Sequence, residues 1–300
     1  MAPSANPGPN REPYREPILP AVQGDLHVLA WDDVSFEVDA STGGRVTALR
    51  LAGRNLLTGP EIDAGNFGST FWTSPQSAWG WPPVPEVDHH AYQAAIEGPA
   101  IVMRSARSAS LGVEIEKRFS ADRVRGAVTF EYRIHNLGPE PIQTAPWQIT
   151  RVGPGGLTFY PSGDGSFPPS NLGVRDALGA TWYDYDKAAI TEHQKHFADG
   201  REGWLAHVDR DALLVKTFPA VPRAAHAPGE AQIEIYASPA HTYVEVEAQG
   251  AYETVAPGGA LSWEVVWLAR RLPPLLPIAV GSEALLEHVR ALVAADAAAR

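Results

Sequence analysis

Short apolar stretches that alternate with polar residues dominate the chain from Leu26 onward. Gly, Pro, Asn and Asp interrupt them at short intervals, and residues 34–38 and 128–134 show the period of two most cleanly. Such alternation is typical of β-strands with one buried face, and the second segment is rich in β-branched and aromatic residues that suit a pleated sheet. The pattern predicts an all-β protein.

Further strands are expected along the whole chain. Their ranges are 45–51, 100–105, 113–119, 127–135, 142–152, 203–208, 213–218, 232–237, 243–248 and 261–269. So many strands with turn signals between them indicate large sheets in a sandwich. Only residues 282–293 show a helical pattern, because Leu and Val recur there at three- and four-residue spacings and Ser282 can cap the helix. We expect this helix to be a packing element.

The chain is expected to form one domain behind a short arm. Six of the first 20 residues are proline, which lacks an N–H and has a restricted φ, so residues 1–24 are predicted to be a Pro-rich arm or linker. Residues 25–300 show neither an internal repeat nor a change of composition, and they are predicted to be a single domain.

Charge and composition narrow the classes of function. The formal net charge of −11 disfavours nucleic acid and anionic membranes as partners, because phosphates must be met by Lys and Arg. The absence of cysteine excludes disulfides, thiolate metal sites and cysteine nucleophiles. As it stands the chain shows no signal peptide and is expected in the cytoplasm; if a leader has been removed, a periplasmic or secreted protein is expected. The oligomeric state is left open.

Residues 66–83 form the most unusual segment. They hold three of the nine tryptophans, and Gly and Pro interrupt them, so we expect a shaped loop. Indole rings suit the apolar C–H faces of sugars, and amides can bind sugar hydroxyls. The candidate sugar-binding residues here are Asn66, Trp72, Gln76, Trp79 and Trp81. The alternative is that the tryptophans close the open end of the sandwich core, since Trp buries a large area.

The histidines do not form a recognisable metal motif. His89 follows the aromatic segment and is a further candidate substrate-binding residue. His193 and His196 are three residues apart, a spacing that is frequent by chance. Lys195 between them would repel a cation. We therefore expect no metal and no cofactor.

Two glutamates occupy alternate positions of one predicted strand. Glu245 and Glu247 point to the same side, while the valines between and before them can enter the core. That side is either open to solvent or lines a cleft. In a cleft, two close carboxylates raise one another's pKa, which suits proton transfer.

Both ends of this pattern resemble the galactose mutarotase (aldose 1-epimerase) superfamily. Gly43-Gly44-Arg45 leads into a strand and then to Gly53-x-x-Leu56-Leu57, and Glu247-x-Gln249 is followed by the turn Pro257-Gly258 and a last strand. The segment from Trp72 to Pro83 is similar to one bacterial branch. The resemblance implies a galactose-mutarotase-like β-supersandwich with a short C-terminal helix.

The resemblance also implies a site. In mutarotases a Glu takes the proton from the anomeric hydroxyl while a His protonates the ring oxygen, and Glu247 matches the Glu by its Glu-x-Gln context. At the place of the family's His the chain reads Ala145-Pro146-Trp147-Gln148, so the acid is missing there. Trp147 and Gln148 would bind sugar, and a substitute acid must come from elsewhere.

Three functions remain open. The first is a carbohydrate-binding protein on the mutarotase-like scaffold, for which the tryptophans and Glu247 should converge. The second is a sugar isomerase, epimerase or lyase with Glu247 as base and His196 or Lys195 as acid. The third is a structural or partner-binding sandwich with buried tryptophans. In the first two the partner is a small carbohydrate. An acidic sugar or sugar phosphate is compatible with Lys195, Lys216, Arg151 and Arg201.

Overall fold

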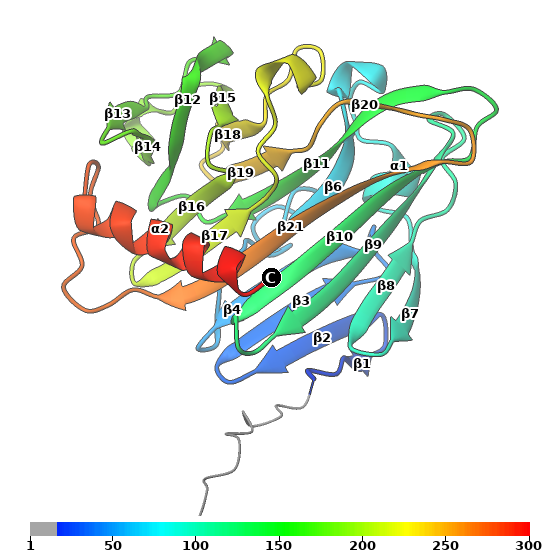
Figure 1. The fold of residues 1–300 in the computed structure, drawn as a ribbon, viewed down its shortest axis with the longest axis horizontal. Helices are drawn as coiled ribbons and strands as arrows, with labels where there is room; N and C mark the ends of the chain where they lie inside the picture. The colour runs from blue at the N-terminus through cyan, green and yellow to red at the C-terminus, as the bar shows by residue number, and fades with distance from the viewer. Residues whose placement is uncertain (1–16) are drawn as a thin grey trace, which may run out of the picture.

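The protein is a continuous antiparallel array of strands folded into two facing sheets (Figure 1). The computed structural model describes residues 17–300, and of residues 164–166 only the backbone. The predicted all-β class is confirmed. Of the predicted arm, residues 1–16 lie outside the described residues, while its end forms a short strand paired with the first sheet.

The first sheet has the strand order β1-β2-β3-β4-β6-β11-β19-β18-β15-β12. Its strands are β1 (Ala21–Gln23), β2 (Leu26–Trp31), β3 (Val34–Asp39), β4 (Arg45–Leu51), β6 (Ser69–Ser74), β11 (Ile142–Val152), β19 (Val244–Gln249), β18 (Ile233–Ala237), β15 (Gln194–Gly200) and β12 (Leu157–Ser170). Two short strands, β5 (Arg54–Asn55) and β20 (Glu253–Val255), pair antiparallel with β4 and with the start of β11.

The second sheet has the order β7-β8-β9-β10-β21-β17-β16-β12-β14-β13, so that β12 belongs to both sheets. Its other strands are β7 (Gln93–Glu97), β8 (Ala100–Arg104), β9 (Val113–Asp122), β10 (Ala127–Asn136), β21 (Ala260–Arg271), β17 (Ala212–Thr217), β16 (Trp204–Asp209), β14 (Ala180–Asp184) and β13 (Arg175–Ala177).

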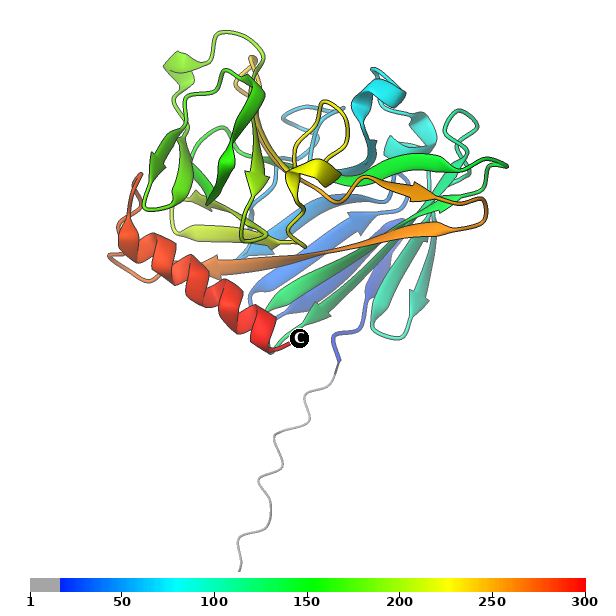
Figure 2. The same cartoon turned by 45° about the horizontal axis from the view of Figure 1, so that its top comes forward.

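Helix α2 (Glu283–Ala298) covers the outer side of the second sheet, as Figures 1 and 2 show. Ser282 Oγ accepts the Leu285 N–H at 3.3 Å, which is the predicted cap. Leu285, Leu286 and Val289 are buried in one cluster with β12, β14, β16 and β17. The predicted C-terminal helix is confirmed. The remaining helical turns are α1 (Pro85–Asp88), η1 (Gln76–Ala78), η2 (Lys187–Ala189) and η3 (Arg223–Ala225). No helix among the described residues has the length and apolar character needed to cross a membrane.

One predicted loop is a strand. Residues 66–83 were expected to form a loop throughout, yet Ser69–Ser74 forms β6, and all six of its residues are buried. The strand lies between β4 and β11 and is covered on both faces, so its sequence shows no alternation. The prediction of a loop is wrong for this part and holds for the turns that follow it.

The space between the sheets contains both aromatic rings and a polar bridge. Phe71 of β6 stacks on Tyr132 of β10, with ring centroids 4.2 Å apart. Gln148 of β11 donates from Nε2 to Tyr132 Oη at 2.7 Å and accepts the Trp267 Nε1–H at 3.0 Å. Gln148 thus joins the first sheet to the second across the buried core.

We expect Gln148→Leu to lower the free energy of unfolding by about 1–3 kcal/mol, because two buried polar groups lose their partner. Urea denaturation measures the change. The matched control is Gln143→Leu on the same strand, whose side chain is exposed and 3.4 Å from Thr254 Oγ1, and which should change stability by no more than about 0.5 kcal/mol. Equal effects of the two substitutions would show that the bridge contributes nothing.

Candidate functional site

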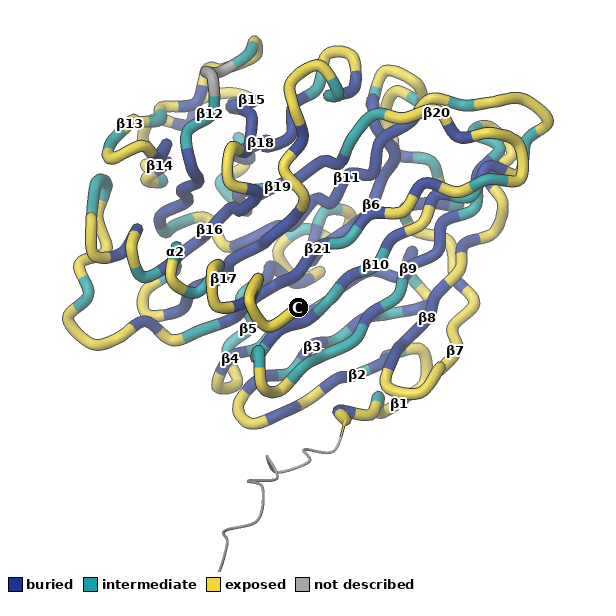
Figure 3. The backbone as a smooth tube through the Cα atoms, in the orientation of Figure 1, coloured by how far each residue is buried: buried dark blue, intermediate teal, exposed yellow. Residues whose placement is uncertain are grey.

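The candidate site lies on the outer face of the first sheet, the face turned away from the second sheet. In β19, Val244, Val246 and Ala248 point into the core, and Glu245 and Glu247 point to the outer face. The two glutamates share a face, as their spacing predicted. Glu247 is 1% exposed and the Glu245 side chain 13% exposed, and Figure 3 shows β11 and β19 almost wholly buried.

Strand β18 brings a third carboxylate to this face. Its register with β19 puts Glu234 directly opposite Glu247, and side chains in such a pair have Cβ atoms about 4.5–5.5 Å apart. Lys195 of β15 extends over the same face, with Nζ 2.8 Å from Glu234 Oε1. The other oxygen of Glu234, Oε2, is buried and has no hydrogen-bond partner among the described residues. Two carboxylates, Glu234 and Glu247, and the ammonium group of Lys195 therefore lie close together on this face.

Burial dominates the titration of this group. It raises the pKa of Glu247 well above its ordinary value, the charges of Glu234 and Glu245 raise it further, and Lys195 and the Trp147 N–H act in the opposite direction. Burial also raises the pKa of Glu234 to about 7, against the effect of Lys195. Both shifts favour the protonated carboxyl, which is the form that can donate a proton.

Strand β11 supplies the partners that hold two of the carboxylates. Trp147 Nε1 donates to Glu247 Oε2 at 2.5 Å. Arg151 Nε lies 2.8 Å from Glu245 Oε1, and its guanidinium carbon is 5.6 Å from the centre of the Trp72 ring. Burial raises the pKa of Glu245, and the charge of Arg151 opposes this rise. These contacts fix the direction in which each carboxylate points.

Four tryptophans meet beside Glu247. The Trp72 ring is in edge-to-face contact with Trp79, Trp81 and Trp147, at centroid distances of 5.7, 6.2 and 5.3 Å. Trp72 and Trp147 are buried, Trp79 is half-buried and Trp81 is 63% exposed. The cluster thus runs from the buried carboxylate to solvent. The interpretation that tryptophans close the core holds for Trp72 and Trp147, and the ring of Trp81 remains exposed.

The rim of this cluster is anchored through Asp88 of α1. Trp72 Nε1 donates to Asp88 Oδ1 at 2.7 Å, and Arg45 Nη2 lies 3.3 Å from Asp88 Oδ2. His89, which was predicted to bind substrate, is exposed beside them with Nδ1 3.7 Å from Asp88 Oδ2. Asp88 therefore connects His89 to the tryptophans.

Gln76 and Asn66 lie on the loops that flank β6. The backbone N–H of Gln76 donates to Glu230 Oε1 at 2.9 Å, which ties the aromatic segment to the loop before β18. Figure 2 shows the two loops rising on the same side of the first sheet. Asn66 is half-buried, and its N–H donates to Asp63 Oδ1 at 2.9 Å.

Two predicted site residues do not reach this face. Because neighbours on a strand point to opposite faces, His196 points away from Lys195 and Glu247, and its ring nitrogens lie 2.7 Å from Tyr160 Oη and 2.6 Å from Ser170 Oγ. Gln148 points between the sheets for the same reason. The structure therefore does not bring His196 or Gln148 together with Glu247.

Glu234, and Tyr236 opposite Glu245 and Lys195, are the residues of this face that the sequence interpretation missed. The order Ile233-Glu-Ile-Tyr shows the same alternation that was noticed at Glu245 and Glu247, and both isoleucines are core residues. That signal was sufficient to place Glu234 and Tyr236 on one face. The alternation did not show which strands would lie beside Glu234 and Tyr236.

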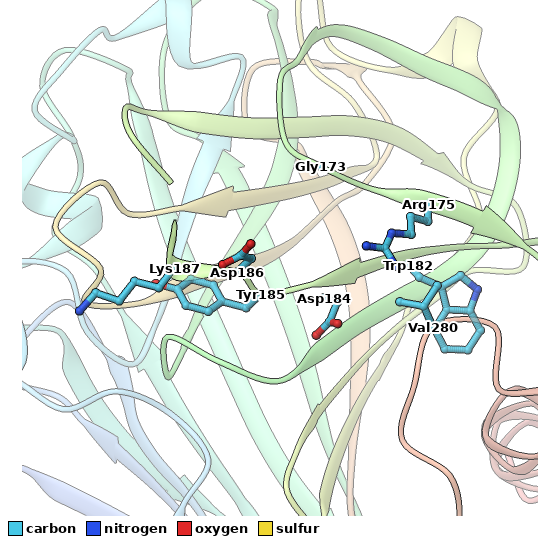
Figure 4. Close-up of a pocket in the computed structure, with 8 residues that line it drawn as sticks. All are labelled: Gly173, Arg175, Trp182, Asp184, Tyr185, Asp186, Lys187 and Val280. Carbon is cyan, nitrogen blue, oxygen red and sulfur yellow. The ribbon is translucent and has the colours of Figure 1, made fainter. Parts of the chain in front are cut away.

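A pocket with a volume of about 450 Å³ lies elsewhere, at β13 and β14 (Figure 4). Its lining already has internal partners: Trp182 Nε1 donates to Ala177 O at 3.1 Å, and Asp186 Oδ1 accepts the Ala188 N–H at 2.9 Å. Its charged side chains are of both signs. The buried carboxylates of the outer face are the stronger indication of chemistry.

Comparison with known proteins identifies a family and several structures with a similar fold. The model of a family described as "Domain of unknown function (DUF4380)" matches residues 27–270. Curated proteins give no match. Among solved structures, the chain is similar to the Slr1438 protein from Synechocystis sp. PCC 6803, with a TM-score of 0.58 and 14% identity over 86% of this chain and 99% of that one.

Two further solved structures carry descriptive names. A galactose mutarotase-like protein from Clostridium acetobutylicum has a TM-score of 0.56 and 10% identity, covering 85% of this chain and 98% of that one. The galactose 1-epimerase from Lactobacillus acidophilus NCFM has a TM-score of 0.54 and 12% identity, with the same coverage of 85% and 98%. At these identities the similarity shows the galactose mutarotase-like fold.

We expect Trp147→Phe to raise the pKa of the Glu247 carboxyl still further, because the substitution removes an N–H that stabilises the charged form. A ¹³C NMR titration of the glutamate side-chain carboxyl carbons measures the midpoint. Trp79→Phe is the matched control, since its Nε1 donates to Thr73 O at 2.8 Å and not to a carboxylate. An unchanged or lower midpoint in Trp147→Phe would contradict the role given to this hydrogen bond.

Proposed function

The chain belongs to the DUF4380 family, and from this membership, its galactose mutarotase-like fold and the outer face of its first sheet we propose that it binds a carbohydrate beside Glu247. The observation that carries the proposal is the convergence of a buried carboxylate with a graded cluster of tryptophans. Aromatic faces suit sugar C–H groups, and carboxylates accept bonds from sugar hydroxyls.

The exposed Trp81 marks the approach to this site. Its ring contacts Trp72, which contacts Trp147, and Trp147 holds Glu247. A sugar that enters from solvent meets an aromatic face first and the hydrogen-bonding groups afterwards. Lys195, which is half-buried beside Glu234, offers a second donor at the rim.

A second candidate function is anomer exchange, and the facing pair of Glu247 and Glu234 favours it. The carboxylate of one takes the proton of the anomeric hydroxyl while the protonated partner, next to Lys195, gives its proton to the ring oxygen. The bond from C1 to the ring oxygen breaks and an open-chain aldehyde forms. Reclosure on the other face of the carbonyl returns both protons, so no atom is gained or lost.

In this scheme the Glu234–Lys195 pair takes the place of the histidine that protonates the ring oxygen in mutarotases. His196 does not serve, because its ring points to the other face of the sheet. The raised pKa of Glu234, about 7 and caused chiefly by burial, suits an acid at neutral pH.

We expect Trp81→Ala to weaken sugar binding about tenfold or more, because burying a large apolar side chain contributes about 1.5–3 kcal/mol. Saturation-transfer NMR with a panel of monosaccharides identifies a ligand, and calorimetry with that ligand measures the affinity. Leu275→Ala removes another exposed apolar side chain, distant from the tryptophans in sequence, and should leave the affinity unchanged. If no sugar in the panel binds to the wild-type protein, the proposal is wrong.

We expect Glu247→Gln to reduce the rate of α/β anomer exchange of the bound sugar about 10²–10⁴-fold, as the loss of a general acid or base does. Exchange is followed by NMR in the same tubes as binding. Glu131→Gln is the control, because Glu131 lies on β10 of the second sheet and pairs with Arg118 at 3.8 Å rather than facing Glu234. Binding without any enzyme-dependent exchange in the wild type would exclude the second function and leave the first.

A further inference from the structure

The outer face continues along β15 beyond the carboxylates. Lys195, Phe197 and Asp199 alternate on this side, and Phe197 is directly opposite Glu234 in the neighbouring strand. Asp199 lies two residues farther along, which is about 6.6 Å along a strand. The carboxyl group of Asp199 therefore belongs to the same surface as Glu234, one side chain away from it.

A pocket of about 280 Å³ opens at Asp199. It is walled by β15 on one side and by the segment around η3 on the other, where Arg223 lies. Arg201, which follows β15, also lines it. Among the side chains that the structure describes, the pocket contains one acidic and two basic groups, although the whole chain is acidic.

The carboxyl group of Asp199 is buried and has an acceptor without a partner among the described residues. The relative exposure of the residue is 8%, and the acceptor is Oδ1. An unsatisfied buried acceptor costs about 1–3 kcal/mol or more when charged, so such atoms are rare unless something binds them. Gly163 adjoins Oδ1 so closely that a Cβ there would lie 2.4 Å from it, and any larger residue would occupy this space.

Arg223 is held in position by an aromatic ring. Its guanidinium carbon lies 4.0 Å from the centre of the Phe167 ring, a close cation–π contact. Stacking leaves the edge of the guanidinium, which carries the N–H donors, available for an anion. Arginine binds carboxylates and phosphates in this way with two parallel hydrogen bonds.

We propose that this pocket binds the anionic group of the sugar, a carboxylate or a phosphate, between Arg201 and Arg223, while an adjacent hydroxyl donates to Asp199. The substrate class is then an acidic or phosphorylated monosaccharide whose ring extends toward Glu234 and Glu247. This inference rests on the proposed function, because it assigns the chemistry of the ligand at the same face.

Calorimetry with three probes tests it: galactose, galacturonate and galactose 6-phosphate, each at low and at high salt. We expect at least one of the two anionic sugars to bind at least tenfold more tightly than galactose, and salt to reduce this difference, because screening weakens exposed charge pairs. The comparison of galacturonate with galactose 6-phosphate decides between carboxylate and phosphate.

In the double variant Arg201→Gln/Arg223→Gln, we expect the preference for the anionic sugar to disappear while galactose binds as before. Asp199→Asn, which keeps the shape and removes the charge, should weaken all three sugars about equally. Arg210→Gln is the matched control, since Arg210 is exposed and pairs with Asp209 at 3.4 Å outside the pocket. Thermal denaturation of each variant shows that the fold is retained.

Two results would overturn the inference in different ways. If galactose binds as tightly as both anionic sugars, or if the double variant keeps the preference for an anionic sugar, the pocket does not bind the anionic group. Either result would leave the proposed carbohydrate site beside Glu247 unaffected. If none of the three binds to the wild-type protein and the wider sugar panel is also negative, the proposed function itself fails and this inference fails with it.

Discussion

The constraint on which the site depends is the burial of several carboxylates on the outer face of the first sheet. Removing a charged carboxylate from water costs several kcal/mol unless a partner compensates it. Trp147 and Arg151 each hold one carboxylate of β19, and Lys195 holds Glu234. Glu247 faces Glu234 rather than a cation, so this pair carries the remaining cost as a raised pKa. Glu234 and Glu247 are thus best suited to proton transfer because the surrounding residues offset the cost of burying their charges least.

The sandwich core supports this face from below. Lys216 of β17 crosses the space between the sheets, and its Nζ donates to Val246 O at 2.8 Å and to Thr150 Oγ1 at 3.0 Å. Burial lowers the pKa of Lys216 to about 7, and the charge of Glu247 on the other side of the strand opposes this shift. Together with Gln148, this lysine ties the two central strands of the site to the second sheet, so the outer face rests on a rigid base.

The fold was readable from sequence where one face of a strand is buried. Residues 128–134 alternate because β10 has one side in the core, and they lie within a strand as predicted. Residues 69–74 do not alternate, because neighbours cover β6 on both faces, and Gly and Pro around it suggested a loop. The sequence analysis did not predict the strands from β12 to β15, for a related reason. Strand β12 belongs to both sheets, and along its length it pairs first with β14 and β16 and then with β15.

By itself the sequence determined which side chains share a face. Glu245 and Glu247 do so because the period of a strand is two, a property of the local backbone alone. That Glu234 lies opposite Glu247, and that Lys195 rather than His196 joins them, was decided only by the tertiary structure. The register between β15, β18 and β19 is set by the burial of all their apolar positions together, and a shift of one residue would send His196 to the site and the carboxylates into the core.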